Sequence, residues 1–130
     1  MNTEQVQGWL DGYVEGWRRN DREQIAALFT EDAVYYTDPF REPYRGQGAI
    51  LRYWEESGDV PDAFDAHYEP LFAAGDHAVA HGYSRYFTQD RKSVDKEYRN
   101  VFVLRFDGDG RCAEYREWYM LRRDPPSAGA

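Results

Sequence analysis

The sequence predicts an α+β fold in which three N-terminal helices cover one face of an antiparallel sheet. Apolar residues recur at three- and four-residue steps early in the chain, and the period changes to two later on. Helices followed by antiparallel strands are typical of α+β domains. The length of 130 residues suits one hydrophobic core. We therefore expect a single domain over residues 1–123 and a mobile C-terminal tail over residues 124–130.

The first helix is predicted over residues 3–19, where the apolar side chains fall on one stripe. Asp21 and Gln24 resemble a capping box, which predicts that a short second helix begins there and runs over residues 21–29. A third helix is predicted near residues 47–57. The side chains expected to be buried are Val6, Leu10, Tyr13, Val14 and Trp17 in the first helix, Ile25, Leu28 and Phe29 in the second, and Ile50, Leu51 and Trp54 in the third.

A first strand is predicted over residues 33–38, and Pro39 ends it because proline supplies no hydrogen-bond donor to a sheet. Alternation puts Val34, Tyr36 and Asp38 on one face of this strand, and Tyr35 and Thr37 on the other. Longer strands follow, joined by turns that favour hairpins. These strands are predicted at residues 63–72, 77–87, 98–106 and 111–121, with a polar loop at 88–97 and a tight turn at 107–110.

The composition argues against several classes of function. The formal net charge is −8, so we expect neither a nucleic-acid partner nor an anionic membrane, because both repel an acidic protein. The N-terminus lacks the basic start and apolar stretch of a signal peptide, and the longest apolar run, residues 25–29, is too short to span a membrane. Cys112 is the single cysteine, which excludes an internal disulfide and fits a cytoplasmic location.

The order of the elements, together with the segments LFTEDAVYYTDPF, PYRG and LRFDGDGR, resembles the nuclear transport factor 2-like superfamily. Within it, the SnoaL-like and ketosteroid isomerase-like branch is the most similar in these segments, and the resemblance covers about residues 5–121. It implies a cone-shaped half-barrel, in which a curved sheet and the helices enclose a pocket. It also implies a homodimer formed through the outer face of the sheet. One fold of this kind hosts many activities, so the resemblance predicts fold better than function.

Two residues match catalytic positions of the isomerase branch. Asp38, in an Asp-Pro-Phe segment, matches the aspartate that removes a proton next to a carbonyl. Tyr13 matches the tyrosine that donates to the developing oxyanion. Each has a structural alternative, since Asp38 can close an Asx turn and Tyr13 can be a core aromatic. Phe102 stands where the isomerases have a second, acidic donor, which argues against a steroid isomerase activity.

Strand alternation predicts which other side chains line the pocket. If Phe102 points inward, then alternate residues on its own strand and on the neighbouring strands do so too. A shift of one residue would place them in solvent instead. Inward polar residues either pair with one another or bind a polar ligand, and His81 would orient Asp38 as a base. The expected inward set is Val79, His81, Tyr83, Arg85, Tyr98, Asn100, Leu104, Tyr115, Glu117 and Tyr119.

No metal ion or cofactor is expected. His77 and His81 lie four residues apart in a predicted strand, which separates their rings by ~13 Å, too far for one ion. One cysteine and three histidines make no zinc motif. The Gly46-x-Gly48 segment lacks the third glycine of a dinucleotide-binding loop and the Gly-Lys pair of a P-loop.

These observations favour a pocket for a small, largely apolar organic molecule. One hypothesis is cofactor-free proton transfer of the isomerase, cyclase or dehydratase type, with Asp38 as the base and His81 or Tyr13 assisting. The alternative is a non-catalytic ligand-binding or dimeric interaction module of the same fold. A transport adaptor is a third class, for which the sequence shows no partner-binding patch. The expected wall residues are Trp17, Tyr36, Trp54, Phe102 and Tyr119.

Overall fold

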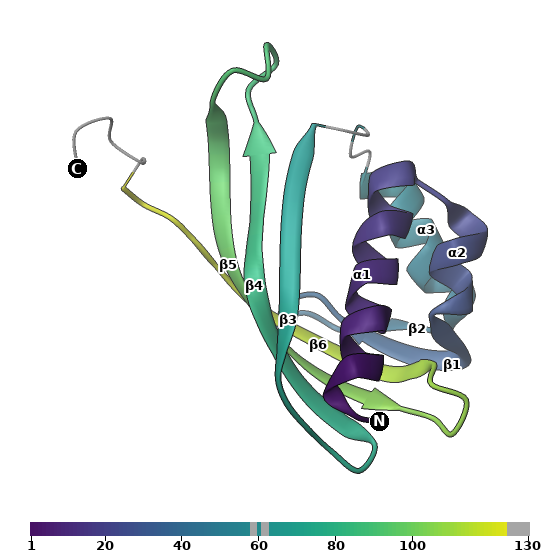
Figure 1. Ribbon diagram of the computed structural model, residues 1–130. Coiled ribbons are helices and arrows are strands. Elements are labelled where there is room, and N and C mark those ends of the chain that lie inside the picture. Colours follow the sequence, from purple (N-terminus) through teal and green to yellow (C-terminus); the bar gives the residue numbers. More distant parts are fainter. Residues whose placement is uncertain (58–59, 61–62, 125–130) are drawn as a thin grey trace.

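The computed structural model describes residues 1–57, 60 and 63–124 (Figure 1). Its helical layer consists of α1 (Thr3–Arg19), α2 (Arg22–Ala27) and α3 (Gln47–Ser57). The three helices were all predicted, and their bounds differ from the predicted ones by no more than two residues. The predicted tail, 124–130, lies outside the described residues apart from Asp124.

Local hydrogen bonds explain where the first two helices begin and end. Asn2 and Gln5 form a reciprocal capping box at the start of α1. Asn20 ends that helix in a left-handed conformation with φ of 51°, and its N–H bonds to the last carbonyls. The Asp21 carboxylate then accepts a hydrogen bond from the Gln24 N–H and begins α2. The sharp turn between α1 and α2 thus follows from two adjacent polar residues, Asn20 and Asp21.

Six strands form one open sheet in the order β2-β1-β6-β5-β4-β3. Neighbouring strands are antiparallel, except that β1 and β6 pair in parallel. These two strands are far apart in the chain, so no hairpin imposes an antiparallel direction on them. The predicted α+β fold, with helices on a curved sheet, is confirmed. The strands are β1 (Phe29–Tyr36), β2 (Tyr44–Arg45), β3 (Phe64–Ala74), β4 (His77–Phe87), β5 (Val94–Phe106) and β6 (Cys112–Leu121).

The sheet bends strongly, and the helices occupy its concave side. In Figure 1, strands β3, β4 and β5 rise beside α1, while β1, β2 and part of β6 pass beneath the helices. Gly82 in β4 sits where β3 comes nearest: a Cβ there would lie 1.9 Å from the His67 carbonyl oxygen and 2.8 Å from Tyr68 Cα. Only glycine permits this approach of the two backbones. The concave surface that holds the site therefore depends on position 82.

Aromatic side chains of α1 pack into the core and set the direction of the residues next to them. Trp9 stacks on Tyr13 with ring centroids 5.4 Å apart, and it meets Phe29 edge-on. One turn further along, Trp17 stacks on Phe64 at 3.9 Å. Such contacts add to the burial of apolar area. They hold the Tyr13 hydroxyl and the Trp17 ring towards the space between α1 and the sheet.

Strand β4 turns the opposite set of side chains inward from the set predicted. Ala80 pairs with Phe102 and Ser84 with Tyr98, and directly paired residues share one face of a sheet. Val79, His81, Tyr83 and Arg85 therefore lie on the outer face, contrary to prediction. The error arose because the small residues Ala78, Ala80, Gly82 and Ser84 form the inner face, so the larger side chains marked the wrong one. A shift of one residue reverses a whole strand.

Strand β1 shows the same reversal. Tyr35, predicted on the face opposite Asp38, is 2% exposed and stacks on Tyr115 with ring centroids 4.2 Å apart. Tyr36, predicted as a pocket wall, faces outward, where the Arg116 guanidinium lies 4.0 Å from its ring centroid. The physical reason is the register with β6, in which Tyr35 pairs with the inward-facing Tyr115.

Candidate functional site

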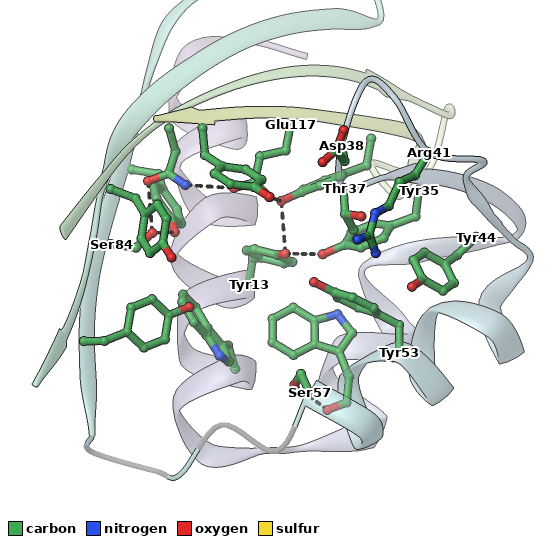
Figure 2. A pocket seen from close by; sticks show the side chains of 18 residues that line it. Tyr13, Tyr35, Thr37, Asp38, Arg41, Tyr44, Tyr53, Ser57, Ser84 and Glu117 are labelled. Atoms are coloured by element: carbon green, nitrogen blue, oxygen red, sulfur yellow. Dashed lines mark hydrogen bonds between the residues drawn. The ribbon is translucent and has the colours of Figure 1, made fainter. Parts of the chain in front are cut away.

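A pocket of about 340 Å³ lies between α1, α3 and the concave side of the sheet. This volume is at the small end of ligand pockets, which run from ~300 to 1,000 Å³. The deepest side chains are tyrosines and a short polar row, whereas Arg41, Ser57 and Tyr119 are exposed and mark the mouth. Figure 2 draws the lining side chains, which are Tyr13, Trp17, Tyr35, Thr37, Asp38, Arg41, Tyr44, Tyr53, Trp54, Ser57, Tyr68, Ser84, Tyr86, Tyr98, Asn100, Tyr115, Glu117 and Tyr119.

Three buried tyrosine hydroxyls form a row that leads to the Glu117 carboxyl. The Tyr115 hydroxyl donates to Glu117 Oε1 at 2.9 Å. Tyr13 and Tyr115 hydroxyls are 3.1 Å apart, and Tyr13 and Tyr35 hydroxyls 2.6 Å. Each phenol has one proton to donate. Because the Tyr115 proton goes to Glu117, Tyr13 donates to Tyr115 and Tyr35 donates to Tyr13 (Figure 2).

A second row reaches Glu117 from the other side. Asn100 Nδ2 donates to Glu117 Oε2 at 2.8 Å. The Ser84 hydroxyl donates to Asn100 Oδ1 at 3.0 Å, and the Tyr68 and Ser84 hydroxyls are 2.6 Å apart. Since the Ser84 proton is used on Asn100, Tyr68 donates to Ser84. Six hydrogen-bond donors from α1 and five strands are thus aligned towards one carboxyl group.

The environment of Glu117 places its titration near neutrality. Burial raises the pKa of this carboxyl from 4.5 to about 7, and the hydrogen bonds from Asn100 and Tyr115 oppose part of that rise. Burial likewise raises the pKa of Tyr13, Tyr35 and Tyr115 well above 10, so these phenols stay protonated and act as donors. Glu117 keeps some accessible surface towards the pocket. A carboxyl group of this kind can accept and return a proton at physiological pH.

The two rows respond differently when Glu117 gains a proton. A protonated carboxyl must donate to an acceptor, and the Asn100 amide N–H cannot accept. The Tyr115 oxygen can accept, provided that the three phenols rotate and reverse their donation towards Tyr35. The tyrosine row therefore accommodates both protonation states of Glu117, while the Asn100 row holds the carboxyl in place.

The free energy of unfolding is expected to depend on pH because of this carboxyl. Because the pKa of Glu117 is raised from 4.5 to about 7, the folded state binds more protons than the unfolded state between those pH values. Its contribution to the free energy of unfolding is therefore lost as pH rises through this window, by on the order of 3 kcal/mol at ~1.36 kcal/mol per pKa unit. Denaturant titrations of the wild type and Glu117→Gln from pH 5 to 8.5 measure this loss of unfolding free energy.

The Glu117→Gln variant is expected to become more stable relative to the wild type as pH rises, because the glutamine side chain cannot ionise. Glu31→Gln is the matched control, since it makes the same change at an exposed position of β1 and is expected to follow the wild type. Parallel curves for the wild type and Glu117→Gln would contradict the buried, neutral-pH carboxyl.

The loop after β1 contributes a second carboxylate and a cation to the pocket. Asp38 lines the pocket and is partly exposed, and its Oδ1 accepts a hydrogen bond from the Phe40 N–H at 2.8 Å. This is the Asx turn that was the structural alternative for Asp38. Arg41 follows in the same loop, and Figure 2 shows its side chain directed towards Tyr35. On α3, Trp54 is 8% exposed, and its Nε1 has no hydrogen-bond partner among the described residues.

The structure brings together part of the predicted site. Tyr13, Asp38 and Glu117 line one pocket, as do the predicted wall residues Trp17, Trp54 and Tyr119 and the predicted inward residue Asn100. Phe102 faces inward but lies in the core beneath the pocket, 4.7 Å from Tyr68 between ring centroids.

The remaining predicted residues lie elsewhere. His81 is on the outer face, where its Nε2 is 3.4 Å from Glu69 Oε1, so it cannot orient Asp38. Arg85 is also on that face, 2.6 Å from Glu97 Oε1, and its guanidinium covers the Tyr83 ring. His81, Tyr83 and Arg85 all lie outside the pocket for one reason, the reversed alternation of β4.

Sequence reasoning missed several lining residues. Tyr35 and Ser84 were missed because alternation was assigned to the wrong face of their strands. Tyr68 lies on β3, for which no facing was predicted. Arg41 lies in a loop, where no periodicity applies. The signal that would have found Ser84 is the alternating run of small residues Ala78, Ala80, Gly82 and Ser84 on β4. The facing of Tyr35 follows from the register of β1 with β6, for which the sequence holds no local signal.

No three His, Cys, Asp or Glu side chains gather as a metal site within the described part of the chain. None of the described helices is both long and apolar enough to cross a lipid bilayer. Cys112 is buried, and burial raises the pKa of its thiol.

Comparison with known proteins places this chain in a family. The model of the SnoaL-like domain matches residues 10–115, and the chain belongs to that family. A solved structure of a candidate ketosteroid isomerase from Kribbella flavida DSM 17836 is similar, with a TM-score of 0.70 and 21% identity, over 97% of this chain and 85% of that one. A nuclear transport factor 2-like protein of unknown function from Pseudomonas putida KT2440 is also similar, with a TM-score of 0.68 and 21% identity.

The second alignment covers 88% of this chain and 84% of the Pseudomonas protein. No curated protein matches the chain in sequence. At 21% identity the two structures show a shared fold, the nuclear transport factor 2-like half-barrel, which agrees with the resemblance seen in the sequence.

Proposed function

We propose that this chain binds a small organic molecule in the pocket and moves a proton on it without a cofactor, with Glu117 as the acid–base group. The observation that carries the proposal is the convergence of two rows of hydrogen-bond donors on a buried carboxyl whose pKa is about 7. Such an arrangement costs stability at neutral pH and serves no packing need that an apolar residue would not meet. Perturbed carboxyls of this kind gather at functional sites.

The chemistry is a proton transfer in which Glu117 takes up one proton and gives it up again, so that the carboxylate is regenerated. The Glu117 carboxylate takes a proton from an acidic C–H or O–H of the ligand, and the ligand retains the electron pair. The protonated carboxyl then returns that proton to another atom, which gives an isomer, a ring-closed product or, where hydroxide leaves with it, a dehydrated product. The tyrosine row stabilises both protonation states of Glu117 during the cycle.

Asp38 and Tyr13 enter this proposal in different roles from those first expected. Asp38 is the rival base, because it lines the same pocket, but its Oδ1 is engaged by the Phe40 N–H. The Tyr13 hydroxyl is committed at both ends, to Tyr35 and Tyr115. It therefore positions the network rather than donating directly to a ligand oxyanion.

Deuterium exchange tests the proposal and separates the two carboxylates. The probe is 2-tetralone, an enolisable bicyclic ketone, whose hydrogens next to the carbonyl are followed by NMR in D₂O. The wild type is expected to accelerate exchange, and Glu117→Gln to remove the acceleration. Asp38→Asn is expected to keep it, and to keep the stability within ~0.5 kcal/mol, since an asparagine oxygen still accepts from Phe40. Loss of exchange in Asp38→Asn alone would transfer the role to Asp38.

The outer face of the sheet supports a proposed homodimer, which is compatible with either a catalytic or a purely ligand-binding pocket. Val101 and Trp118 are each 42% exposed and Met120 is 76% exposed, and the three follow one another across β5 and β6. Large exposed apolar side chains that lie together mark interaction surfaces. Sedimentation velocity of the wild type and Trp118→Glu checks this, with a dimer expected for the first and a monomer for the second. We further propose a cytoplasmic location, which the single buried thiol supports.

A further inference from the structure

Two donor groups of the pocket have no hydrogen-bond or ion-pair partner among the described residues. Trp54 lines the pocket, and its buried Nε1–H has no acceptor among the described residues. An indole N–H is a donor only, and a buried donor left unpaired costs ~1–3 kcal/mol. Native structures contain few such groups, and each one calls for an explanation. A ligand atom that accepts a hydrogen bond explains this one.

The second donor is Arg41, the one cationic side chain among the lining residues that the structure describes. It has no ion-pair partner in the described part of the chain, although Asp38 stands three residues earlier in the same loop. The Asp38 carboxylate is instead engaged by the Phe40 N–H. The guanidinium is therefore available, and its planar fork matches a carboxylate, to which it can donate two parallel hydrogen bonds.

The pocket is thus divided by its chemistry into two ends. Donors from the protein already satisfy Glu117, at the end formed by β5 and β6. At the other end, formed by α3 and the loop after β1, Trp54 and Arg41 are donors without a partner among the described residues, and the nearby Asp38 carboxylate accepts from the Phe40 N–H. Between them the walls are aromatic and can contact a planar ring system on its faces and edges.

We propose that the ligand is an aromatic or fused-ring carboxylic acid, bound as the anion with its carboxylate at Arg41 and Trp54 and its ring body directed towards Glu117. A carboxylate is acceptor-only and can accept from either unpaired donor, whereas an ammonium group can accept from neither. The assignment rests on the proposed function for the place of binding, and it narrows the ligand from a largely apolar molecule to an anionic one.

Three probes that share two fused rings test the assignment by isothermal titration calorimetry at pH 7. They are 2-naphthoate, the neutral 2-acetylnaphthalene and the cationic 2-naphthylmethylammonium. We expect 2-naphthoate to bind at least ~10-fold more tightly than the ketone, because a charge-assisted bidentate pair is about twice as strong as a neutral hydrogen bond. The ammonium probe is expected to bind most weakly of the three.

Single substitutions assign the effect to the two donors. Arg41→Gln is expected to remove the preference for 2-naphthoate over the ketone. Arg45→Gln, at an exposed arginine of β2 that does not line the pocket, is the matched control and is expected to keep it. Trp54→Phe keeps an aromatic wall, and it is expected to weaken both oxygen-bearing probes while leaving 2-methylnaphthalene unchanged.

Each failure points to a different claim. Equal binding of acid and ketone, tighter binding of the ammonium probe, or an acid preference that survives Arg41→Gln would overturn the carboxylate assignment and leave proton transfer at Glu117 untouched. Unchanged deuterium exchange in Glu117→Gln, with 2-naphthoate still bound through Arg41, would overturn the proposed function alone. Absence of binding by all of the probes would overturn the assignment, whatever the exchange assay shows.

Discussion

Replacing Glu117 with glutamine is expected to slow proton transfer by ~10²–10⁴-fold, the usual contribution of a positioned acid–base group. The glutamine has nearly the same shape and keeps both neighbours: its oxygen accepts from Asn100, and its amide N–H donates to Tyr115 once the phenol row reverses. It cannot, however, take up a proton. Exchange rates of 2-tetralone in D₂O measure the loss, and calorimetry with the same probe measures whether binding persists.

The outcome of this substitution separates chemistry from architecture. If the exchange rate falls while the dissociation constant of the probe stays within about threefold of the wild-type value, the result supports Glu117 as the proton-transferring group. The substitution has then changed the chemical step and not the binding. Glu31→Gln, the exposed control, is expected to exchange at the wild-type rate. An unchanged rate in Glu117→Gln would leave the carboxyl a structural member of the network.

Gly82→Ala is expected to destabilise the protein by more than ~3 kcal/mol, beyond the usual cost of overpacking. The added Cβ would lie 1.9 Å from the His67 carbonyl oxygen and 2.7 Å from Tyr68 Cδ1, so the β3 backbone and the Tyr68 ring must both move. The Tyr68–Ser84 hydrogen bond of 2.6 Å lies at this point. Thermal and urea denaturation measure the change.

Gly8→Ala provides the matched control within the same chain. Gly8 lies in the exposed part of α1, and a Cβ there would meet no atom within 4 Å. Because alanine has a higher helix propensity than glycine, the free energy of unfolding of this variant is expected to rise by ~0.5–1 kcal/mol. Equal stability of Gly82→Ala and the wild type would mean that β3 and β4 do not approach as closely at this point.

The sequence predicted the layers of this fold well because each rests on a local pattern. The apolar stripe of α1 and the glycine turn before α3 are read from neighbours a few residues apart, and both helices appear where predicted. The four long strands appear for the same reason. The parallel pairing of β1 with β6 has no local signal, since it joins two ends of the chain that only the folded sheet brings together.

The candidate site was harder to predict, because its chemistry depends on facing and burial. Glu117 was expected to point inward, and it lines the pocket, but no spacing in the sequence shows that donors from α1 and β5 as well as its own strand converge on it. Asp38 carries the recognisable motif, yet its side chain closes a turn. On β4 one residue of register moved His81 from the expected site to the outer face.

Titration of the Glu117 carboxyl tests the central claim most directly. Protein labelled with ¹³C at the glutamate carboxyl carbons gives one NMR signal per glutamate. The signal that is missing from the spectrum of Glu117→Gln is the signal of Glu117. We predict that this signal titrates with a midpoint near the pKa of about 7 that burial gives the group. A midpoint near the ordinary glutamate value of ~4.3 would contradict the account, because Glu117 would then be a fully ionised carboxylate at neutral pH.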